Sequence, residues 1–127
     1  HLRSALFRRV AEFFDSVDIL LMPCTPVGAF SADLWHPDTV AGRPMDTYLD
    51  WMRHLYFVSV AGMPAMSLPA GFTASGSPIG VQLVAGPRRD RALVQFAYAL
   101  EQARGPLSPP FASPAASSPR GPLADLG

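Results

Sequence analysis

Two apolar stretches, VAGMPAMSLPAGF at residues 60–72 and SPIGVQLVAGP at residues 77–87, decide how this chain folds. Each contains a short apolar run, at 65–68 and 80–85, and glycines and prolines bound the runs as they commonly bound strands. The segment 69–78 between the runs is rich in Gly, Pro and Ser, which favour turns. We therefore expect two strands that lie side by side in one sheet.

A third apolar stretch, DILLMPCTP at residues 18–26, stands closer to the N-terminus. Its run of apolar side chains stops at Pro23, because proline has no N–H to donate to a neighbouring strand. A continuous apolar run of this length is typical of a strand that is buried on both faces. The sequence thus predicts a third strand, in a sheet that is covered on both sides.

Three further segments have the spacing of helices. Residues 2–14 place apolar side chains on one stripe, which is the period of an amphipathic helix. Thr47 and Asp50 have the form of a capping box, which predicts a second helix that starts at Thr47 and runs to Gly62. Asp90 is a suitable N-cap for a third helix that ends at residue 104.

This order of elements predicts an α/β fold, in which the strands form part of a mixed sheet flanked by helices. The sheet is expected to be incomplete, because its edges would be unprotected if it stood alone. We expect one unit over residues 1–104 and a Pro-, Ser- and Ala-rich disordered tail over residues 105–127, a composition with little apolar surface to bury. Residues 27–44 show no periodicity and are expected to form a long loop.

The balance of ten basic and ten acidic residues argues against a nucleic-acid partner, since it leaves no basic stripe. No apolar run is long enough for a membrane-spanning helix. A single cysteine, Cys24, cannot form an internal disulfide, and we expect a cytoplasmic protein. We expect no cofactor and no metal site, because His36 and His54 lack the spacing of ligands.

The three stretches, in this order and followed by a helix that begins at Asp90, resemble the C-terminal part of amidase-signature enzymes. The resemblance extends from about Leu2 to Ala103. It implies a large mixed sheet covered by helices, and hydrolysis of carboxamide bonds through an acyl-enzyme on a nucleophilic Ser. In that family a Lys activates the nucleophile through a second Ser.

The general base of that family has no counterpart in this chain, whose ten basic residues are all Arg. Arg cannot replace the Lys, because a guanidinium group stays protonated at any working pH. The glycine- and serine-containing segment 74–78 does not match the family's nucleophile motif. The resemblance thus implies that the catalytic residues lie in an N-terminal part of a parent enzyme, that none is in this chain, and that the chain alone is inactive.

Four residues are candidates for lining the substrate channel. Cys24 and Thr25 follow the strand of residues 18–22, at a turn that faces the channel in similar enzymes. Trp51 and Tyr56 belong to an aromatic stripe that could form a wall of the acyl pocket. Each has a structural alternative: a buried thiol for Cys24, a local cap for Thr25 and core packing for the two aromatic residues.

Gln82 is expected inside a strand, where its amide needs hydrogen-bond partners from a structural network or from a ligand.

The resemblance also implies two partners: a small-molecule amide substrate and the N-terminal remainder of the same domain. A homodimer stays open. So do two other roles for the chain: part of a subunit of a tRNA-dependent amidotransferase, and a non-catalytic structural or interaction fragment.

Overall fold

The structure is a computed structural model that describes residues 1–108 of the 127. Most of the expected disordered tail, residues 109–127, therefore lies outside the described residues. The helices and strands, in chain order, are α1 (Leu2–Phe13), β1 (Ile19–Pro23), β2 (Thr39–Val40), β3 (Arg43–Pro44), α2 (Arg53–Ala61), β4 (Ala65–Phe72), β5 (Pro78–Ala85) and α3 (Asp90–Arg104).

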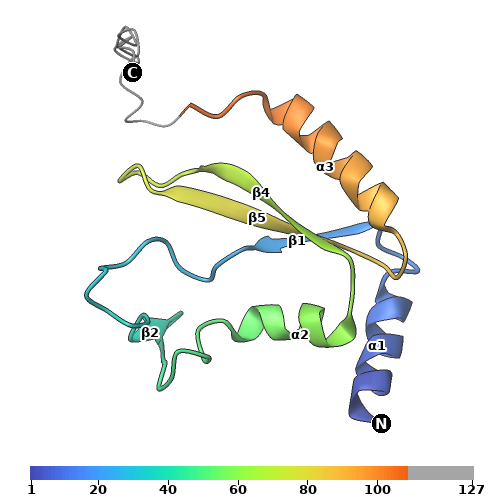
Figure 1. Cartoon of the computed structure of the whole chain (residues 1–127), viewed down its shortest axis with the longest axis horizontal. Helices are drawn as coiled ribbons and strands as arrows, with labels where there is room; N and C mark the ends of the chain where they lie inside the picture. The colour runs from blue at the N-terminus through green and yellow to red at the C-terminus, as the bar shows by residue number, and fades with distance from the viewer. Residues whose placement is uncertain (109–127) are drawn as a thin grey trace, which may run out of the picture.

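The main sheet has the strand order β1-β5-β4, and both pairings are antiparallel. The predicted neighbours β4 and β5 form a hairpin, as Figure 1 shows. Both strands are longer than expected: β4 continues past Pro69 to Phe72, and β5 begins at Pro78 rather than at Gly80. Pro69 is tolerated since β4 is an edge strand among the described residues, where an absent N–H costs no ladder bond. The pairing is irregular between Pro69 and Gly71.

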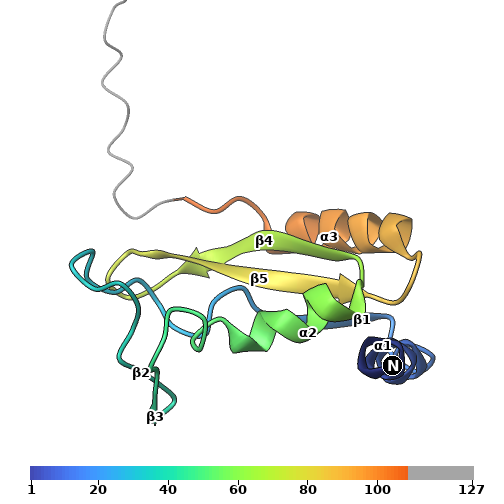
Figure 2. The same ribbon diagram turned by 60° about the horizontal axis from the view of Figure 1, so that its bottom comes forward.

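Helices cover both faces of the sheet, as Figure 2 shows: α3 on one side, α1 and α2 on the other. Successive residues of β5 point to opposite faces, so Leu83 packs toward α3 and Val84 toward α1 and α2. Both side chains are fully buried. The predicted helix at residues 2–14 is confirmed as α1, whose partly buried Leu6 and Val10 pack against the group of buried residues around Val84.

The expectation that β1 is buried on both faces is not met within residues 1–108. β1 is an edge strand there, and Leu21 is 48% exposed. The burial of a strand depends on what covers it, and none of the described residues pairs with the outer edge of β1 or of β4. The sheet thus has open edges, as the sequence predicted for an incomplete sheet.

The second helix begins later than predicted, at Arg53 rather than Thr47. Thr47 does engage Asp50: its N–H and its hydroxyl donate to Asp50 Oδ2 at 2.9 and 2.7 Å. These bonds close a turn over residues 47–52, and α2 starts only after it. Thr47 and Asp50 are therefore hydrogen-bonded, as a capping box requires, but they close a turn instead of starting a helix. A spacing of three residues fits both arrangements.

The expected loop at residues 27–44 contains a small hairpin of β2 and β3. Ala41 and Gly42 form its two-residue turn, with φ of 50° and 75°. Two successive positive φ values suit a hairpin turn, since its twist then matches that of the strands. This hairpin carries the chain from the end of β1 to the start of α2, on the side of the molecule where the candidate site lies (Figure 1).

Candidate functional site

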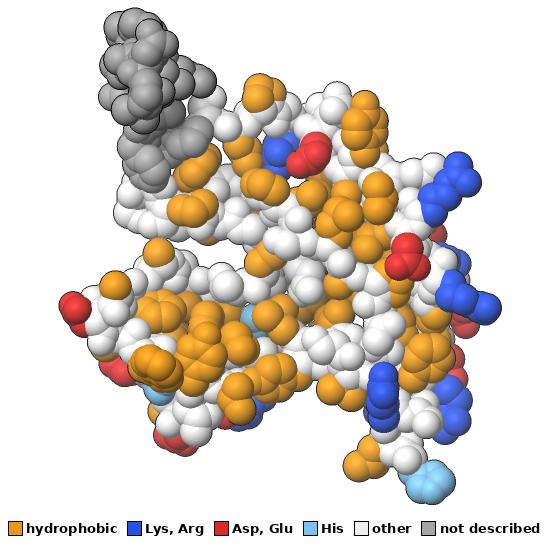
Figure 3. All heavy atoms as spheres, viewed as in Figure 1, with side chains coloured by type: hydrophobic (Ala, Val, Ile, Leu, Met, Phe, Trp, Pro, Cys, Tyr) orange, Lys and Arg blue, Asp and Glu red, His pale blue; other side chains and the backbone are white. Residues whose placement is uncertain are grey.

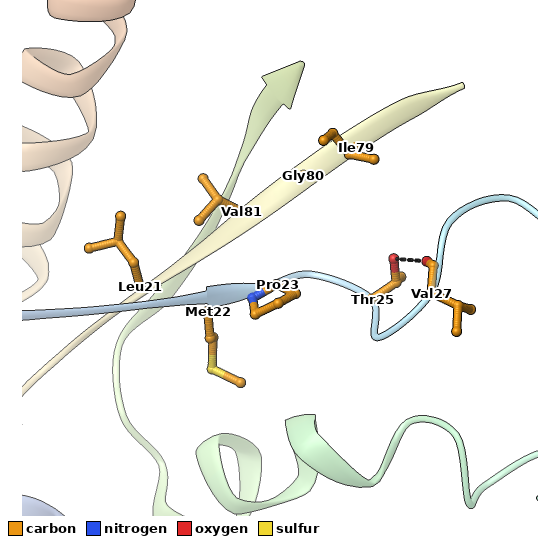
Figure 4. A pocket seen from close by; sticks show the side chains of 8 residues that line it. All are labelled: Leu21, Met22, Pro23, Thr25, Val27, Ile79, Gly80 and Val81. Atoms are coloured by element: carbon orange, nitrogen blue, oxygen red, sulfur yellow. Dashed lines mark hydrogen bonds between the residues drawn. The ribbon is translucent and has the colours of Figure 1, made fainter. Parts of the chain in front are cut away.

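β1 ends at a hollow of about 430 Å³, which we call the strand-end hollow (Figure 4). Its lining comes from β1, the segment after it and the start of β5: Leu21, Met22, Pro23, Thr25, Val27, Ile79, Gly80 and Val81. The only side-chain hydroxyl in this lining is that of Thr25, which donates to the backbone oxygen of Val27 at 2.9 Å. The hollow therefore has an apolar wall.

A second hollow of about 260 Å³, the aromatic hollow, adjoins the first. It is lined by Thr25, Val27, Gly28, Ala29, Phe30, Trp51 and Pro78. The two hollows share Thr25 and Val27, so this short segment is a wall of both. None of these lining residues, all within the described part of the chain, carries a charge.

Four aromatic side chains form a continuous aromatic row from this hollow to the surface. The ring centroids of Phe30 and Trp51 are 5.8 Å apart, those of Trp51 and Tyr48 6.0 Å, and those of Tyr48 and Trp35 6.2 Å. Trp35, at the far end, is 82% exposed. Figure 3 shows hydrophobic side chains gathered on this face over the segment that precedes α2.

A group of polar side chains lies on the sheet face toward α2. The Cys24 sulfur lies 3.1 Å from the Ser67 hydroxyl oxygen. Ser67 pairs in register with Gln82, whose side-chain oxygen is buried and has no hydrogen-bond partner among the described residues. An unpaired buried oxygen is costly, so Gln82 marks a place where a donor from outside the described residues would be favourable.

The structure brings together two of the four predicted channel residues. Thr25 and Trp51 line the same hollow. Cys24 lines neither hollow, because its thiol turns to Ser67. Tyr56 lines neither, and its hydroxyl donates to the backbone oxygen of Leu49 at 2.7 Å, which ties α2 to the turn before it. The role of all four in a channel stays a prediction.

Phe30 and Pro78, which complete the aromatic hollow, were not among the residues predicted from the sequence. Phe30 lies in the stretch that shows no periodicity, and Pro78 lies in the segment predicted to form a turn. The only signal for Phe30 is an aromatic residue shortly after the turn at Pro23 and Pro26, which is a weak pattern. Its contact with Trp51 spans 21 positions and depends on how the loop returns to α2.

The two internal histidines contact backbone oxygens. His54 Nε2 lies 3.3 Å from Pro23 O, and its Nδ1 is buried without a partner among the described residues. His36 Nδ1 lies 3.2 Å from Pro37 O. Within residues 1–108, no three His, Cys, Asp or Glu side chains gather in a group that could hold a metal ion.

Asp50 has a lowered pKa, chiefly because the Thr47 hydroxyl donates to its carboxylate, and secondly because Arg53 does so as well. The carboxylate joins the turn that precedes α2 to the first residue of that helix. Trp51 lies within this turn, so Asp50 helps to place the Trp51 ring beside the aromatic hollow.

None of the helices in residues 1–108 is both long and apolar enough to traverse a lipid bilayer.

The sequence matches a family model described as Amidase over residues 1–94. A glutamyl-tRNA(Gln) amidotransferase subunit of Acaryochloris marina is 40% identical over 89 residues, which are 70% of this chain and 17% of that protein. The same subunit of Desulfosudis oleivorans is 38% identical over 101 residues, 80% of this chain and 20% of that protein. The chain thus spans about a fifth of the length of these relatives.

Solved structures are similar as well. A bacterial aryl acylamidase of the amidase-signature enzymes has a TM-score of 0.64 and 28% identity, over 80% of this chain and 21% of that one. The glutamyl-tRNA(Gln) amidotransferase subunit of Thermotoga maritima has a TM-score of 0.59 and 26% identity, over 79% and 20%. A vestigial complex related to an s-triazine catabolic enzyme has a TM-score of 0.71 and 28% identity, over 82% and 22%.

Proposed function

This chain belongs to the amidase family, and on that premise we propose that its full-length protein hydrolyses a carboxamide bond of a small molecule. The family match over residues 1–94 is the observation that carries this proposal. The reaction would pass through a Ser acyl-enzyme, with a Lys as general base. Because this chain has no Lys, the nucleophile and the base would come from the remaining part of the protein.

In this proposal the described residues contribute strands and a wall of the substrate channel. Thr25 and Trp51 support the proposal, since both line the aromatic hollow. Cys24 and Tyr56 would line the channel in the complete protein, where further elements surround the sheet. Gln82 would then find a donor for its buried oxygen.

The proposed partner of this chain is the N-terminal remainder of the same domain. Two features support it: the outer edges of β1 and β4 are unpaired among the described residues, and a further hollow of about 430 Å³, lined by apolar side chains and by Arg9, lies between α1, α2 and β1. Phe13 and Phe57, which line this hollow, are 44% and 36% exposed. Covering them would remove apolar surface from water and stabilise the assembly.

A second candidate function is that of part of an amidotransferase subunit that acts within a complex. It is favoured by the names of the two relatives described above. In that case the amide would serve as a source of ammonia for a second subunit. Activity would then require the surfaces that contact this subunit as well as the channel.

The test uses the purified full-length protein and a panel of small amides, with release of the amine or ammonia as the readout. Turnover is expected, and mass spectrometry should detect an acyl adduct on a Ser outside residues 1–127. The matched control is this chain alone, which should release nothing. Turnover that requires both a charged tRNA and a partner subunit would favour the amidotransferase. A full-length protein with neither turnover nor an adduct under either condition would exclude both functions.

A further inference from the structure

We infer that the aromatic hollow binds a flat, uncharged aromatic group of the substrate, so that the preferred substrates are neutral aryl amides. This inference rests on the proposed amide hydrolysis and adds a substrate class to it. It concerns the hollow lined by Phe30 and Trp51, together with Thr25, Val27 and Pro78.

The size of the hollow suits one ring. Its volume is about 260 Å³, whereas an apolar cavity of about 150 Å³ accommodates benzene. A ring with a short substituent therefore fills it, and a larger group would project out of it. The adjoining strand-end hollow, which shares Thr25 and Val27, offers apolar space for that projection.

The chemistry of the lining excludes charged groups. Its side chains are uncharged, and only two of them carry a polar group: the Thr25 hydroxyl, whose hydrogen is donated to Val27 O, and the Trp51 indole N–H, which is buried and has no acceptor among the described residues. A carboxylate or ammonium group that entered would lose water and gain no charged partner, which is strongly unfavourable. An aromatic ring would instead gain from the removal of apolar surface from water.

The geometry of the aromatic walls favours a ring over an aliphatic chain. Phe30 and Trp51 meet edge to face, with an interplanar angle of 88°. Tyr48 contacts Trp51 at 84° and so helps to hold the indole in place. Aromatic rings prefer such edge-to-face or offset contacts, and a third ring can continue the pattern. A wall held in place before binding also lowers the entropy that binding would lose.

The experiment compares two amides with the full-length protein: acetanilide, and the same anilide with a carboxylate on its ring. Acetanilide should have the higher kcat/KM. The variant Trp51→Leu should lower this kcat/KM about three- to tenfold, the range for the loss of one aromatic contact. The matched control, Trp35→Leu, replaces an aromatic residue that is 82% exposed and does not line the hollow, so it should leave kcat/KM unchanged.

A second variant, Gly28→Leu, fills the hollow without removing an aromatic wall. A Cβ at Gly28 would meet only Thr73 Cγ2, at the ordinary distance of 3.7 Å, so this protein should fold. It should lose acetanilide turnover as Trp51→Leu does. Melting curves of all variants report whether each is folded. A Trp51→Leu or Gly28→Leu protein that is folded and keeps full preference for acetanilide would overturn the inference.

Binding is measured separately, by quenching of tryptophan fluorescence with acetanilide. Binding that Gly28→Leu removes while Trp51 still reports it, without turnover of any amide, would support the aromatic hollow and count against the proposed hydrolysis. Turnover of amides with equal or better rates for the carboxylated anilide would support hydrolysis and overturn the inference. Neither binding nor turnover would overturn both.

Discussion

The Cys24 thiol and the Ser67 hydroxyl lie 3.1 Å apart across β5, a strand to which neither belongs. The contact passes over Gly80, where no side chain stands in the way. A Cβ at Gly80 would lie 3.0 Å from Cys24 Sγ and 3.4 Å from Leu68 O. The backbone N–H of Cys24 also donates to Gly80 O at 3.2 Å. Glycine at position 80 thus allows the segment after β1 to approach β5 closely.

Substitution of Gly80 by Ala should destabilise the protein. The added methyl group overlaps the Cys24 thiol and presses on the backbone of β4, and overpacking of this kind costs about 1–3 kcal/mol. Urea unfolding of the full-length variant measures the change. The double variant Cys24→Ala with Gly80→Ala should recover most of the loss, because the thiol is gone. A double variant no more stable than Gly80→Ala would show that the contact with Cys24 is not the cause.

Leu93 should be the most sensitive position of α3. It is only 3% exposed and packs with Leu68 and Leu83 between the helix and the sheet. Leu93→Ala leaves a cavity and should cost about 2–5 kcal/mol in the free energy of unfolding. The control is Val94→Ala at the next position, which is 53% exposed and should change stability by less than about 0.5 kcal/mol. Equal effects at both positions would contradict the packing of α3 described here.

Removal of the Tyr56 hydroxyl should loosen the turn before α2. The hydroxyl donates to Leu49 O at 2.7 Å, and a hydrogen bond of this kind contributes about 0.5–1.5 kcal/mol. Hydrogen exchange in residues 47–52 should therefore be faster in Tyr56→Phe. Tyr98→Phe is the control, since Tyr98 is 65% exposed on α3. Unchanged exchange in the turn would indicate that this bond adds nothing there.

Asp50 should give a stabilising contribution that depends on pH. The Thr47 hydroxyl, and then Arg53, lower the pKa of its carboxyl group below the ordinary value of 3.8. A lowered folded pKa contributes stability that is present above the unfolded value and is lost as the pH falls through the folded value. The difference between wild type and Asp50→Asn should thus be constant near neutral pH and shrink below pH 3.8.

Two measurements check this prediction. Carbon-detected NMR of the Asp50 carboxyl group should give a titration midpoint below 3.8, and Thr47→Ala should raise that midpoint because it removes the main donor. A midpoint above 3.8 in the wild type, or a stability difference that grows toward acid pH, would contradict the arrangement of this turn.

The locally determined parts of the fold could be predicted from the sequence. The helices at residues 2–13 and 90–104 and the hairpin of β4 and β5 follow from side-chain periodicity and from glycine and proline, which act on the backbone next to them. The start of α2 could not be predicted as well. A Thr with an Asp three residues later fits both a helix cap and a turn, and the aromatic contacts of Tyr48 and Trp51 accompany the turn.

The sequence by itself determined the order of the elements, the family and the lack of Lys in this chain, because these depend on residue types and their spacing alone. Only the tertiary structure decided that Thr25 faces the hollows while the Cys24 thiol turns to Ser67, and that Trp51 meets Phe30. Neighbouring residues in extended chain point in opposite directions, and which of them faces a cavity is set by segments that pack against it from far along the chain.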